Sequence, residues 1–324
     1  MNSYHPENYL ESLTDKYDEL QETIGRFVVG NADLIEMIML GILSGGSVLI
    51  EGLPGTAKTT IVKTMAILMG CETRRLQCGI DTQPSDILGV RTWNPEARDF
   101  EIRKGPAFTN ILMIDEINRL PPKSQSAFIE TMSEQQATID GITLEMPEPF
   151  FAIATQNPYE MEGVFPLIEV QKDRFMFSMM STYLGREGEY EVLMREQNGS
   201  LDWDRYASGI RPIFNRESLI KGISEVQKVH VDPVIMGYIR DIVIATRSHG
   251  DLRMGVSTRA SIALLRGSRA YAALHQRDYV IPDDIKVLVP LTFRHRLFFR
   301  HEAEISGVLS GSVINQILNS VEVP

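Results

Sequence analysis

The sequence predicts an α/β fold, with a three-layer domain built on a parallel sheet and an all-helical region after it. Three runs of consecutive apolar residues, at 48–50, 111–114 and 150–154, have the length and continuity of strands buried on both faces. Polar residues or glycine follow each run. In an open parallel sheet these residues gather at the carboxyl edge, where ligands bind. After about Thr182 such runs stop and helical patterns continue.

The segment after the first run is typical of a phosphate-binding loop. It reads GLPGTAKTT, and apolar residues at helical spacing follow it. A loop between a strand and a helix directs its backbone N–H groups and the positive end of the helix dipole toward an anion. Lys58 adds a mobile positive charge for the outer phosphates, and Thr59 supplies a hydroxyl for Mg²⁺. The predicted nucleotide-binding residues of this loop are Gly52, Pro54, Gly55, Thr56, Ala57, Lys58, Thr59 and Thr60.

The loop departs from the pattern G-x-x-x-x-G-K-[ST] at one position, because Ala57 stands where the pattern has glycine. A glycine and proline turn with a lysine beside it is the alternative interpretation. The buried strand before the loop and the amphipathic helix after it favour the nucleotide site.

Two carboxylates follow the second apolar run. Asp115 and Glu116 would emerge at the carboxyl edge of the sheet. Asp115 is then placed to hold Mg²⁺, directly or through water. Glu116 is the candidate general base for the water that attacks the γ-phosphate of ATP. Many surface strands end in acidic residues, so an apolar run followed by Asp and Glu is a weak pattern by itself. It indicates a metal and nucleotide site here because a phosphate-binding loop precedes it.

Two further polar positions complete the candidate site. Asn157 follows the third run, and its amide is suited to positioning the attacking water beside Glu116. By itself it is typical of a turn before Pro158. Arg174 lies among the charged residues of the segment 169–175, a pattern that alone is typical of a solvated helix end.

Together these segments resemble the MoxR family of AAA+ ATPases, over the range from about Val28 to the C-terminus. The resemblance is carried by GLPGTAKTT, ILMIDEINR, FFAIATQNP, the EVQKDRF box and the segment 255–260. The family often has alanine at the position of Ala57. The resemblance implies a P-loop domain with a helical lid, and a homo-oligomeric ring, hexameric in the family, that binds ATP between subunits.

The resemblance also implies roles for individual residues. Asn157 would sense the γ-phosphate, Arg174 would act as an arginine finger on a neighbouring subunit, and Arg259 would be a second sensor that reaches over from the lid. Val28 and Val29 match the segment that lines the adenine pocket.

We expect two domains. Residues 1–182 would form the nucleotide-binding domain with an N-terminal helix and two insertions, and residues 183–324 a linker and the helical lid. The first insertion, at about 77–108, corresponds in the family to a segment that projects toward the ring's pore. In the second, at about 137–148, Asp140 and Gly141 are a strong two-residue hairpin signal. Such protrusions are where a remodelling ATPase would contact its client.

Composition is compatible with this class without selecting it. The 324 residues are 43% hydrophobic, which provides ample material for a core. The net charge of −11 gives no general field that would attract nucleic acid. Cys71 and Cys78 are too few for a zinc site and are interpreted as reduced thiols. The polar segment 1–6 and the absence of a long apolar run predict no signal peptide, no membrane span and a cytoplasmic location.

One basic and aromatic cluster, at 294–301, has the mixture found in nucleic-acid binders. In an acidic chain we favour an amphipathic element, with its aromatic residues buried and its charges at a subunit contact or in solvent.

The expected function is ATP hydrolysis coupled to chaperone-like remodelling, maturation or assembly of a partner protein complex. The resemblance suggests a partner with a von Willebrand factor A domain, which this chain lacks. A DNA-directed AAA+ motor or a chelatase-type metal-insertion subunit would share the same motifs. A nucleotide-gated scaffold with little turnover is a third possibility, and no spacing names the client.

Overall fold

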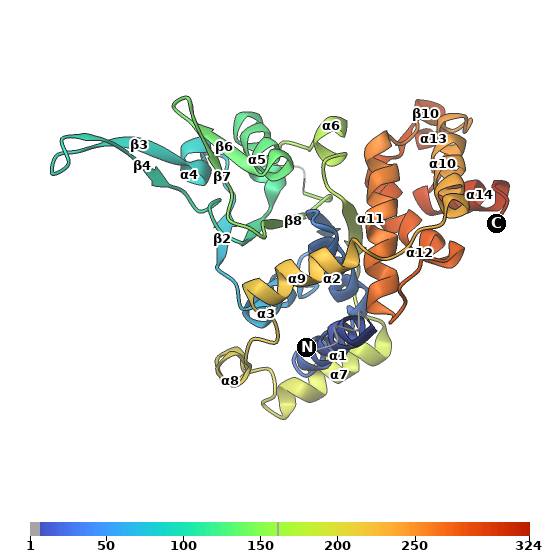
Figure 1. Ribbon diagram of the computed structural model, residues 1–324, viewed down its shortest axis with the longest axis horizontal. Helices are drawn as coiled ribbons and strands as arrows, with labels where there is room; N and C mark the ends of the chain where they lie inside the picture. The colour runs from blue at the N-terminus through green and yellow to red at the C-terminus, as the bar shows by residue number, and fades with distance from the viewer. Residues whose placement is uncertain (1–6, 161) are drawn as a thin grey trace, which may run out of the picture.

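A computed structural model describes residues 7–160 and 162–324 of the chain (Figure 1). The polar segment 1–6, which contributes to the expectation about a signal peptide, lies outside these residues. No helix within the described ranges is both long enough and apolar enough to cross a membrane.

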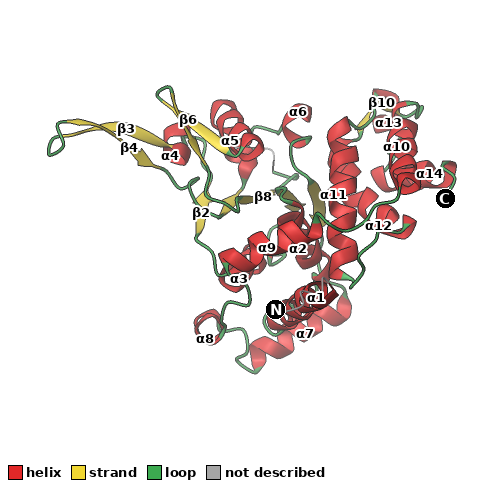
Figure 2. Cartoon of the chain, in the orientation of Figure 1, coloured by secondary structure: helices red, strands yellow, loops and turns green. Residues whose placement is uncertain are grey.

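A parallel five-stranded sheet lies at the centre, with the strand order β2-β5-β8-β1-β9 (Figure 2). Its strands are β1 Val48–Gly52, β2 Thr73–Gln77, β5 Ile111–Asp115, β8 Phe151–Gln156 and β9 Phe177–Ser181. All neighbouring pairs are parallel. β1, β5 and β8 are buried along their whole length, as the three apolar runs predict. The predicted fold class is therefore confirmed.

The two edge strands are not predicted by any apolar run. β2 reads TRRLQ and has no buried residue. β9 reads FSMMS, with Phe177 and Ser178 buried at its start. Their pairing with β5 and β1 makes them strands, and this pairing connects residues far apart in the sequence.

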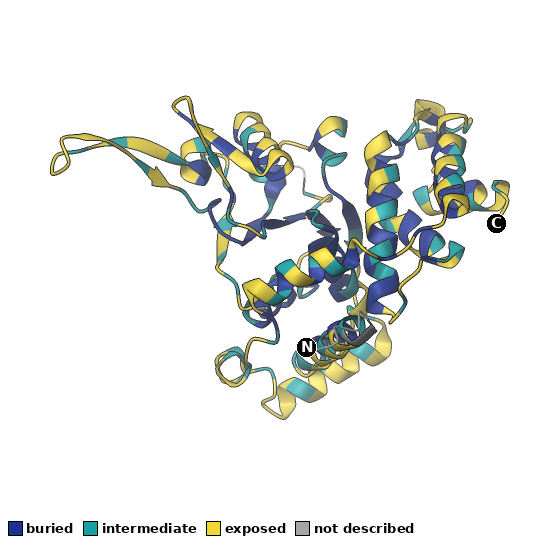
Figure 3. Ribbon diagram, viewed as in Figure 1, coloured by how far each residue is buried: buried dark blue, intermediate teal, exposed yellow. Residues whose placement is uncertain are grey.

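Alternate residues of the central strands belong to two separate cores, which gives the three layers. Ile50 of β1 packs in one core with residues of α1 Glu7–Gly25, α2 Ala32–Ser44 and α3 Lys58–Met69. Leu49 packs in the other core with residues of α4 Pro84–Leu88 and α5 Pro122–Glu134. Figure 3 shows the buried sheet enclosed by helices whose outer faces are exposed.

Two antiparallel hairpins extend from the α/β domain. β3 Gly89–Asn94 pairs with β4 Asp99–Lys104, and this hairpin projects away from the body at one end of the molecule (Figure 1). β6 Gln136–Ile139 pairs with β7 Ile142–Glu145. Asp140 and Gly141 connect β6 to β7 with φ angles of 47° and 80°. Positive φ at both central residues is what a type I′ hairpin turn requires.

The chain after β9 is mainly helical. Its helices are α7 Arg186–Gln197, α8 Trp203–Gly209, α9 Arg216–Val226, α10 Pro233–Arg247, α11 Thr258–Leu274, α12 Pro282–Phe293, α13 His301–Ile305 and α14 Ser310–Ser320. The side chains of Asp232 and Ser257 cap α10 and α11 by accepting backbone N–H groups of the first turn. α9 packs against α2, while α11 contacts α2 and α12 contacts β9.

One small sheet departs from the expectation that strands end near Thr182. β10 Leu252–Met254 pairs with β11 Phe298–Phe299 in antiparallel fashion. These strands are too short for a pattern of period two to stand out in the sequence.

The prediction for the cluster 294–301 is wrong at its centre. His295 and Arg296 are 5% and 2% exposed, whereas Phe298 and Phe299 are only partly buried. The reason is a set of polar contacts across the chain, because Arg296 forms an ion pair with Asp173 of the α/β domain. A buried charge is tolerated where a partner of opposite charge and hydrogen bonds compensate for lost water.

Gly267 of α11 gives a direct test of how the helical region packs on β9. A Cβ added there would lie 2.6 Å from Cζ of the buried Phe177 ring. We expect Gly267→Ala to destabilise the protein, because overpacking of about 1–3 kcal/mol outweighs the helix-propensity gain of about 1 kcal/mol. Gly237→Ala in α10 is the control, since its nearest neighbour is Arg240 Nη2 at 3.9 Å. It should stabilise the fold by about 0.5–1 kcal/mol. Urea unfolding measures both changes, and the same shift in both variants would contradict this packing.

Candidate functional site

The carboxyl ends of β1, β5 and β8 border a cavity of about 550 Å³. All the loop residues predicted from the sequence line it, as do Asp115, Glu116 and Asn157. Four residues that the sequence patterns do not predict complete the lining, namely Arg75, Gln77, Thr155 and Gln156. The parallel arrangement thus brings together polar groups from four separate segments, namely the loop after β1 and the ends of β2, β5 and β8.

The conformation of the loop explains its glycines. Gly52 has φ 156°, and a Cβ added there would lie 2.4 Å from the carbonyl oxygen of Ser181. Ala57 is the N-cap of α3, with φ 58° and ψ 11° in the left-handed region. This is why the sequence pattern has glycine at the position of Ala57. An alanine adopts that conformation at a strain of about 1–2 kcal/mol.

Lys58 lies over its own loop. Its ammonium donates hydrogen bonds to the carbonyl oxygens of Gly52 at 3.1 Å and Leu53, and to Oγ1 of Thr56 at 3.1 Å. Burial lowers the pKa of Lys58, while the nearby carboxylates of Asp115 and Glu116 act in the opposite direction. The positive charge is thus held between the loop carbonyls and the acids of β5, where an anion can reach it.

Asp115 is buried at the end of β5 and has a cationic partner. Its Oδ2 accepts a hydrogen bond of 2.6 Å from Nε of Arg75 on β2. Thr155 of β8 donates to Oδ1 from its Oγ1, at 3.4 Å. Arg75 is a site residue that sequence reasoning missed. A charged residue in a strand-like segment was its only signal, and the pairing of β2 with β5 is what places it here.

Glu116 follows Asp115 with φ 61°, a conformation that is uncommon for a residue with a side chain. Its backbone N–H donates to Oγ1 of Thr155 at 3.1 Å. Its carboxylate accepts from Nε2 of Gln77 at 3.1 Å and lies 3.0 Å from Nε of Arg119. Both side-chain contacts reach Oε2, at the border of the cavity that Glu116 lines.

Asn157 comes directly after β8. Its side-chain Oδ1 accepts the backbone N–H of Tyr159 at 3.2 Å, and its backbone carbonyl accepts from Nδ2 of Asn118 at 3.2 Å. The first bond is the local turn contact that Asn residues favour. It also holds the amide at the edge of the same cavity as Glu116.

The residues that line the cavity fit Mg²⁺. This ion prefers hard oxygen ligands and is usually held by one or two carboxylates together with substrate phosphates. The side chain of Asp115 is only 7% exposed, its carboxylate lies at the cavity where Arg75 already pairs with Oδ2, and Thr59 lines the same cavity. Over the described ranges, no group of three or more His, Cys, Asp or Glu side chains could hold a metal by itself.

Val28 and Val29 line a neighbouring cavity of about 330 Å³. It shares Gly55, Thr56, Ala57 and Thr60 with the first cavity, so the two border the same loop. Leu184 and Val192, from the segment after β9, close its other side. This apolar neighbour of a phosphate loop has the composition that a purine base requires.

Arg174 and Arg259 are brought together, but at the amino ends of the strands, opposite the carboxyl ends that border the first cavity. Both line a cavity of about 250 Å³ that also includes Ser47, just before β1, and Arg266 of α11. The phosphate loop follows the other end of β1. The structure thus separates these arginines from the phosphate loop of their own chain.

Comparison with known proteins finds matches over nearly the whole chain. Residues 47–177 match the ATPase family associated with various cellular activities (AAA), and residues 244–317 match the AAA lid domain. The uncharacterized protein YeaC of Bacillus subtilis is 40% identical over 317 residues, 98% of this chain and 97% of YeaC. Chaperone MoxR1 of Mycobacterium tuberculosis is 36% identical over 336 residues, 98% of this chain and 86% of MoxR1. A crystal structure of a Cytophaga hutchinsonii protein aligns with a TM-score of 0.89 at 37% identity, with 98% of both chains covered.

Proposed function

The chain belongs to the MoxR-type family of AAA ATPases, and from this membership we propose that it hydrolyses ATP and uses the energy to remodel a partner protein. The observation that carries the proposal is the convergence of Lys58, Asp115 and Glu116 on one cavity at the carboxyl edge of the sheet. Phosphoryl transfer needs charge neutralisation and an oriented nucleophile, and this set of side chains can supply both.

In this proposal the loop N–H groups and Lys58 bind the phosphates, and Val28 and Val29 contact the adenine. Thr59 and Asp115 hold Mg²⁺. When bound, this ion neutralises charge on the phosphate oxygens. The overlap of the two cavities around the loop supports this division of the site.

Glu116 is proposed as the general base, and Asn157 as the group that orients the attacking water. The support for Glu116 is that Gln77, at the end of β2, and Arg119 contact its carboxylate at the border of the cavity. A base must lie within hydrogen-bond reach of the water that it deprotonates. A glutamate that lines the cavity and is contacted by Gln77 and Arg119 is suited to this role.

Arg174 and Arg259 are proposed to act on the nucleotide of a neighbouring copy in a ring, hexameric as the family resemblance implies. The support is their shared cavity at the amino edge of the sheet, away from the phosphate loop of the same chain. The nucleotide site then forms between two copies, with the loop from one copy and the arginines from the other.

The client-binding element is proposed to be the β3–β4 hairpin. Its register pairs Trp93 with Phe100 and Arg91 with Ile102, so these four side chains share one face. The rings of Trp93 and Phe100 contact edge to face at 5.2 Å, and both residues are 53% exposed. Exposed aromatic residues on a projecting element are typical of a binding surface. MoxR1, one of the relatives, is named a chaperone.

The first test separates nucleotide binding from turnover. Lys58→Ala should weaken ATP binding by roughly 10-fold or more, because charge-assisted hydrogen bonds to phosphate are lost. Glu116→Gln should retain binding but lower kcat by about 10²–10⁴-fold, because it removes only the base. Calorimetry with ATP and a phosphate-release assay distinguish the two effects. An equal loss of binding in both variants would rule out the general-base role.

A second test asks whether Arg174 acts in trans. An arginine finger is worth about 10³-fold or more in rate, so Arg174→Ala should be nearly inactive while it still binds ATP. Mixed rings of Arg174→Ala and Lys58→Ala would contain some interfaces with an intact loop and an intact finger, about one in four for random mixing. We expect phosphate release to recover on mixing, after subunit exchange is confirmed with a tag. Mixed rings without recovery would exclude a trans finger.

The third test concerns the client. Glu116→Gln should hold its client longer, because it binds ATP without hydrolysing it. A tagged Glu116→Gln protein is therefore used to isolate the client from an extract of the organism that makes this protein. Adding Trp93→Ser and Phe100→Ser should abolish recovery of the client, because the exposed aromatic face is lost. Val90→Ser, on the other face of the same hairpin, is the control and should leave recovery intact. Recovery of nucleic acid alone would favour the DNA-directed motor instead.

A further inference from the structure

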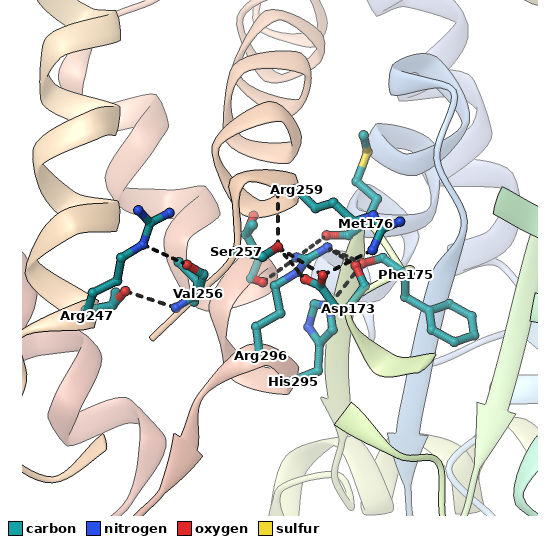
Figure 4. A network of polar contacts seen from close by, with 11 residues as sticks. Asp173, Phe175, Met176, Arg247, Val256, Ser257, Arg259, His295 and Arg296 are labelled. Carbon is teal, nitrogen blue, oxygen red and sulfur yellow. Dashed lines mark hydrogen bonds and ion pairs between the residues drawn. The ribbon is translucent and has the colours of Figure 1, made fainter. Parts of the chain in front are cut away.

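Arg296 is a buried arginine of the helical region that contacts the segment around Arg174 (Figure 4). It lies in the short 3₁₀ turn Arg294–Arg296 after α12 and is 2% exposed. Its Nε donates to Oδ1 of Asp173 at 2.9 Å. Arg174, the proposed finger, is the next residue in the chain after Asp173.

The guanidinium of Arg296 uses all of its hydrogen-bonding capacity. Arginine has five N–H donors. Besides the bond from Nε, Nη1 donates to the carbonyl oxygens of Met176 at 3.0 Å and Thr292 at 2.5 Å. Nη2 donates to the carbonyl oxygens of Asp173 at 3.1 Å and Phe175. Four of these five bonds therefore hold the segment 173–176, on both sides of Arg174.

Other residues of the helical region hold the same segment. The hydroxyl of Ser257, at the start of α11, lies 2.9 Å from both carboxylate oxygens of Asp173. Nη1 of Arg259 lies 3.5 Å from Oδ2 of Asp173. A ring nitrogen of His295 contacts the carbonyl oxygen of Phe175 at 3.0 Å. The backbone beside Arg174 is thus fixed from α11 and from the turn after α12.

The side chain of Arg174 itself is not held in this way. Its Nε is buried and has no hydrogen-bond partner among the described residues. The structure therefore fixes the backbone on both sides of Arg174, whereas the buried Nε of Arg174 has no such contact among the described residues.

We infer that Arg296 is a positioning residue for Arg174. By binding the carbonyl groups on both sides of Arg174, it sets the direction in which this side chain projects from the turn before β9. The inference rests on the proposed role of Arg174 as a finger. It adds that the helical region of one copy controls the finger offered to the next, because a shift of the turn 294–296 would move the segment 173–176 with it.

Arg296→Lys tests this inference. Lysine keeps the charge and most of the side-chain length but lacks the planar fork, so it cannot bind Asp173 and the carbonyl oxygens at the same time. A displacement of about 1 Å at a reacting group can lower a rate by about 10²-fold. We expect kcat to fall by that order while the Kd for ATP, measured by calorimetry, stays unchanged. Full kcat in a folded Arg296→Lys protein would overturn the inference.

The matched control is Asp284→Asn. Asp284 is 1% exposed and forms a two-bond ion pair with Arg277, at 2.6 and 2.8 Å, inside the helical region. It is a buried ion pair of the same kind with no contact to the segment 173–176. Asp284→Asn should lower Tm but leave kcat unchanged. A kcat loss as large as that of Arg296→Lys would show that general destabilisation explains the effect.

Mixing experiments distinguish a positioning role from damage to the variant's own nucleotide site. Rings of Arg296→Lys and Lys58→Ala should recover activity, because the Lys58→Ala copy supplies a well-held finger to the intact loop of its neighbour. No recovery in these rings, while Arg174→Ala and Lys58→Ala rings do recover, would overturn the inference and leave the proposed function standing. If neither mixture recovers, the trans finger itself is wrong. Should Arg296→Lys not fold, Asp173→Asn carries the same test with the same expected results.

Discussion

The candidate site depends on one constraint, the parallel register of β1, β5 and β8. Because the three strands run in the same direction and are buried on both faces, their carboxyl ends meet at one edge, next to Gly52, Asp115 and Asn157. Apolar burial of about 25 cal/mol per Å² fixes the strands, and the strands fix the polar groups. A shift of one residue in β5 would turn Asp115 to the other face of the sheet.

On the proposed function, the amino ends of the strands form a second part of the nucleotide site, and their separation from the phosphate loop implies that the active unit is an assembly. β1 leads from Ser47, beside Arg174 and Arg259, to the phosphate loop. Because β1 lies between these two ends, Arg174 and Arg259 are separated from a nucleotide bound at the phosphate loop of the same chain. In copies related by rotation, the arginine end of one copy can face the phosphate loop of the next. In a closed ring, every phosphate loop then has such a neighbour. On the proposed function, the spacing along β1 is therefore the reason that catalysis requires neighbours.

Local patterns in the sequence predicted the three buried strands, the phosphate loop and the tight turn at Asp140, because each depends on residues adjacent in the chain. β2 and β9 were missed, since pairing and not composition makes them strands. Arg75 was missed for the same reason. The assignment of 294–301 was wrong because a charged residue is normally solvated. Only the three-dimensional structure shows that Asp173, far away in sequence, neutralises Arg296. Sequence reasoning thus reached contacts within a segment and the convergence of the strand ends, which the parallel sheet dictates, but not the pairing of individual side chains from distant segments.

The energetics of Arg296 indicate what such a contact contributes. Burial lowers its pKa to about 10, and Asp173 acts in the opposite direction, so the guanidinium remains charged at neutral pH. Desolvating an ion pair largely offsets its attraction, and apolar residues of similar volume often stabilise a fold as well or better. Stability alone therefore gives little reason for a fully bonded arginine at this position. Apolar contacts permit many nearly equivalent packings, whereas five directed hydrogen bonds permit one. The pair thus fixes the position of the helical region relative to the segment 173–176, and with it the backbone that carries Arg174.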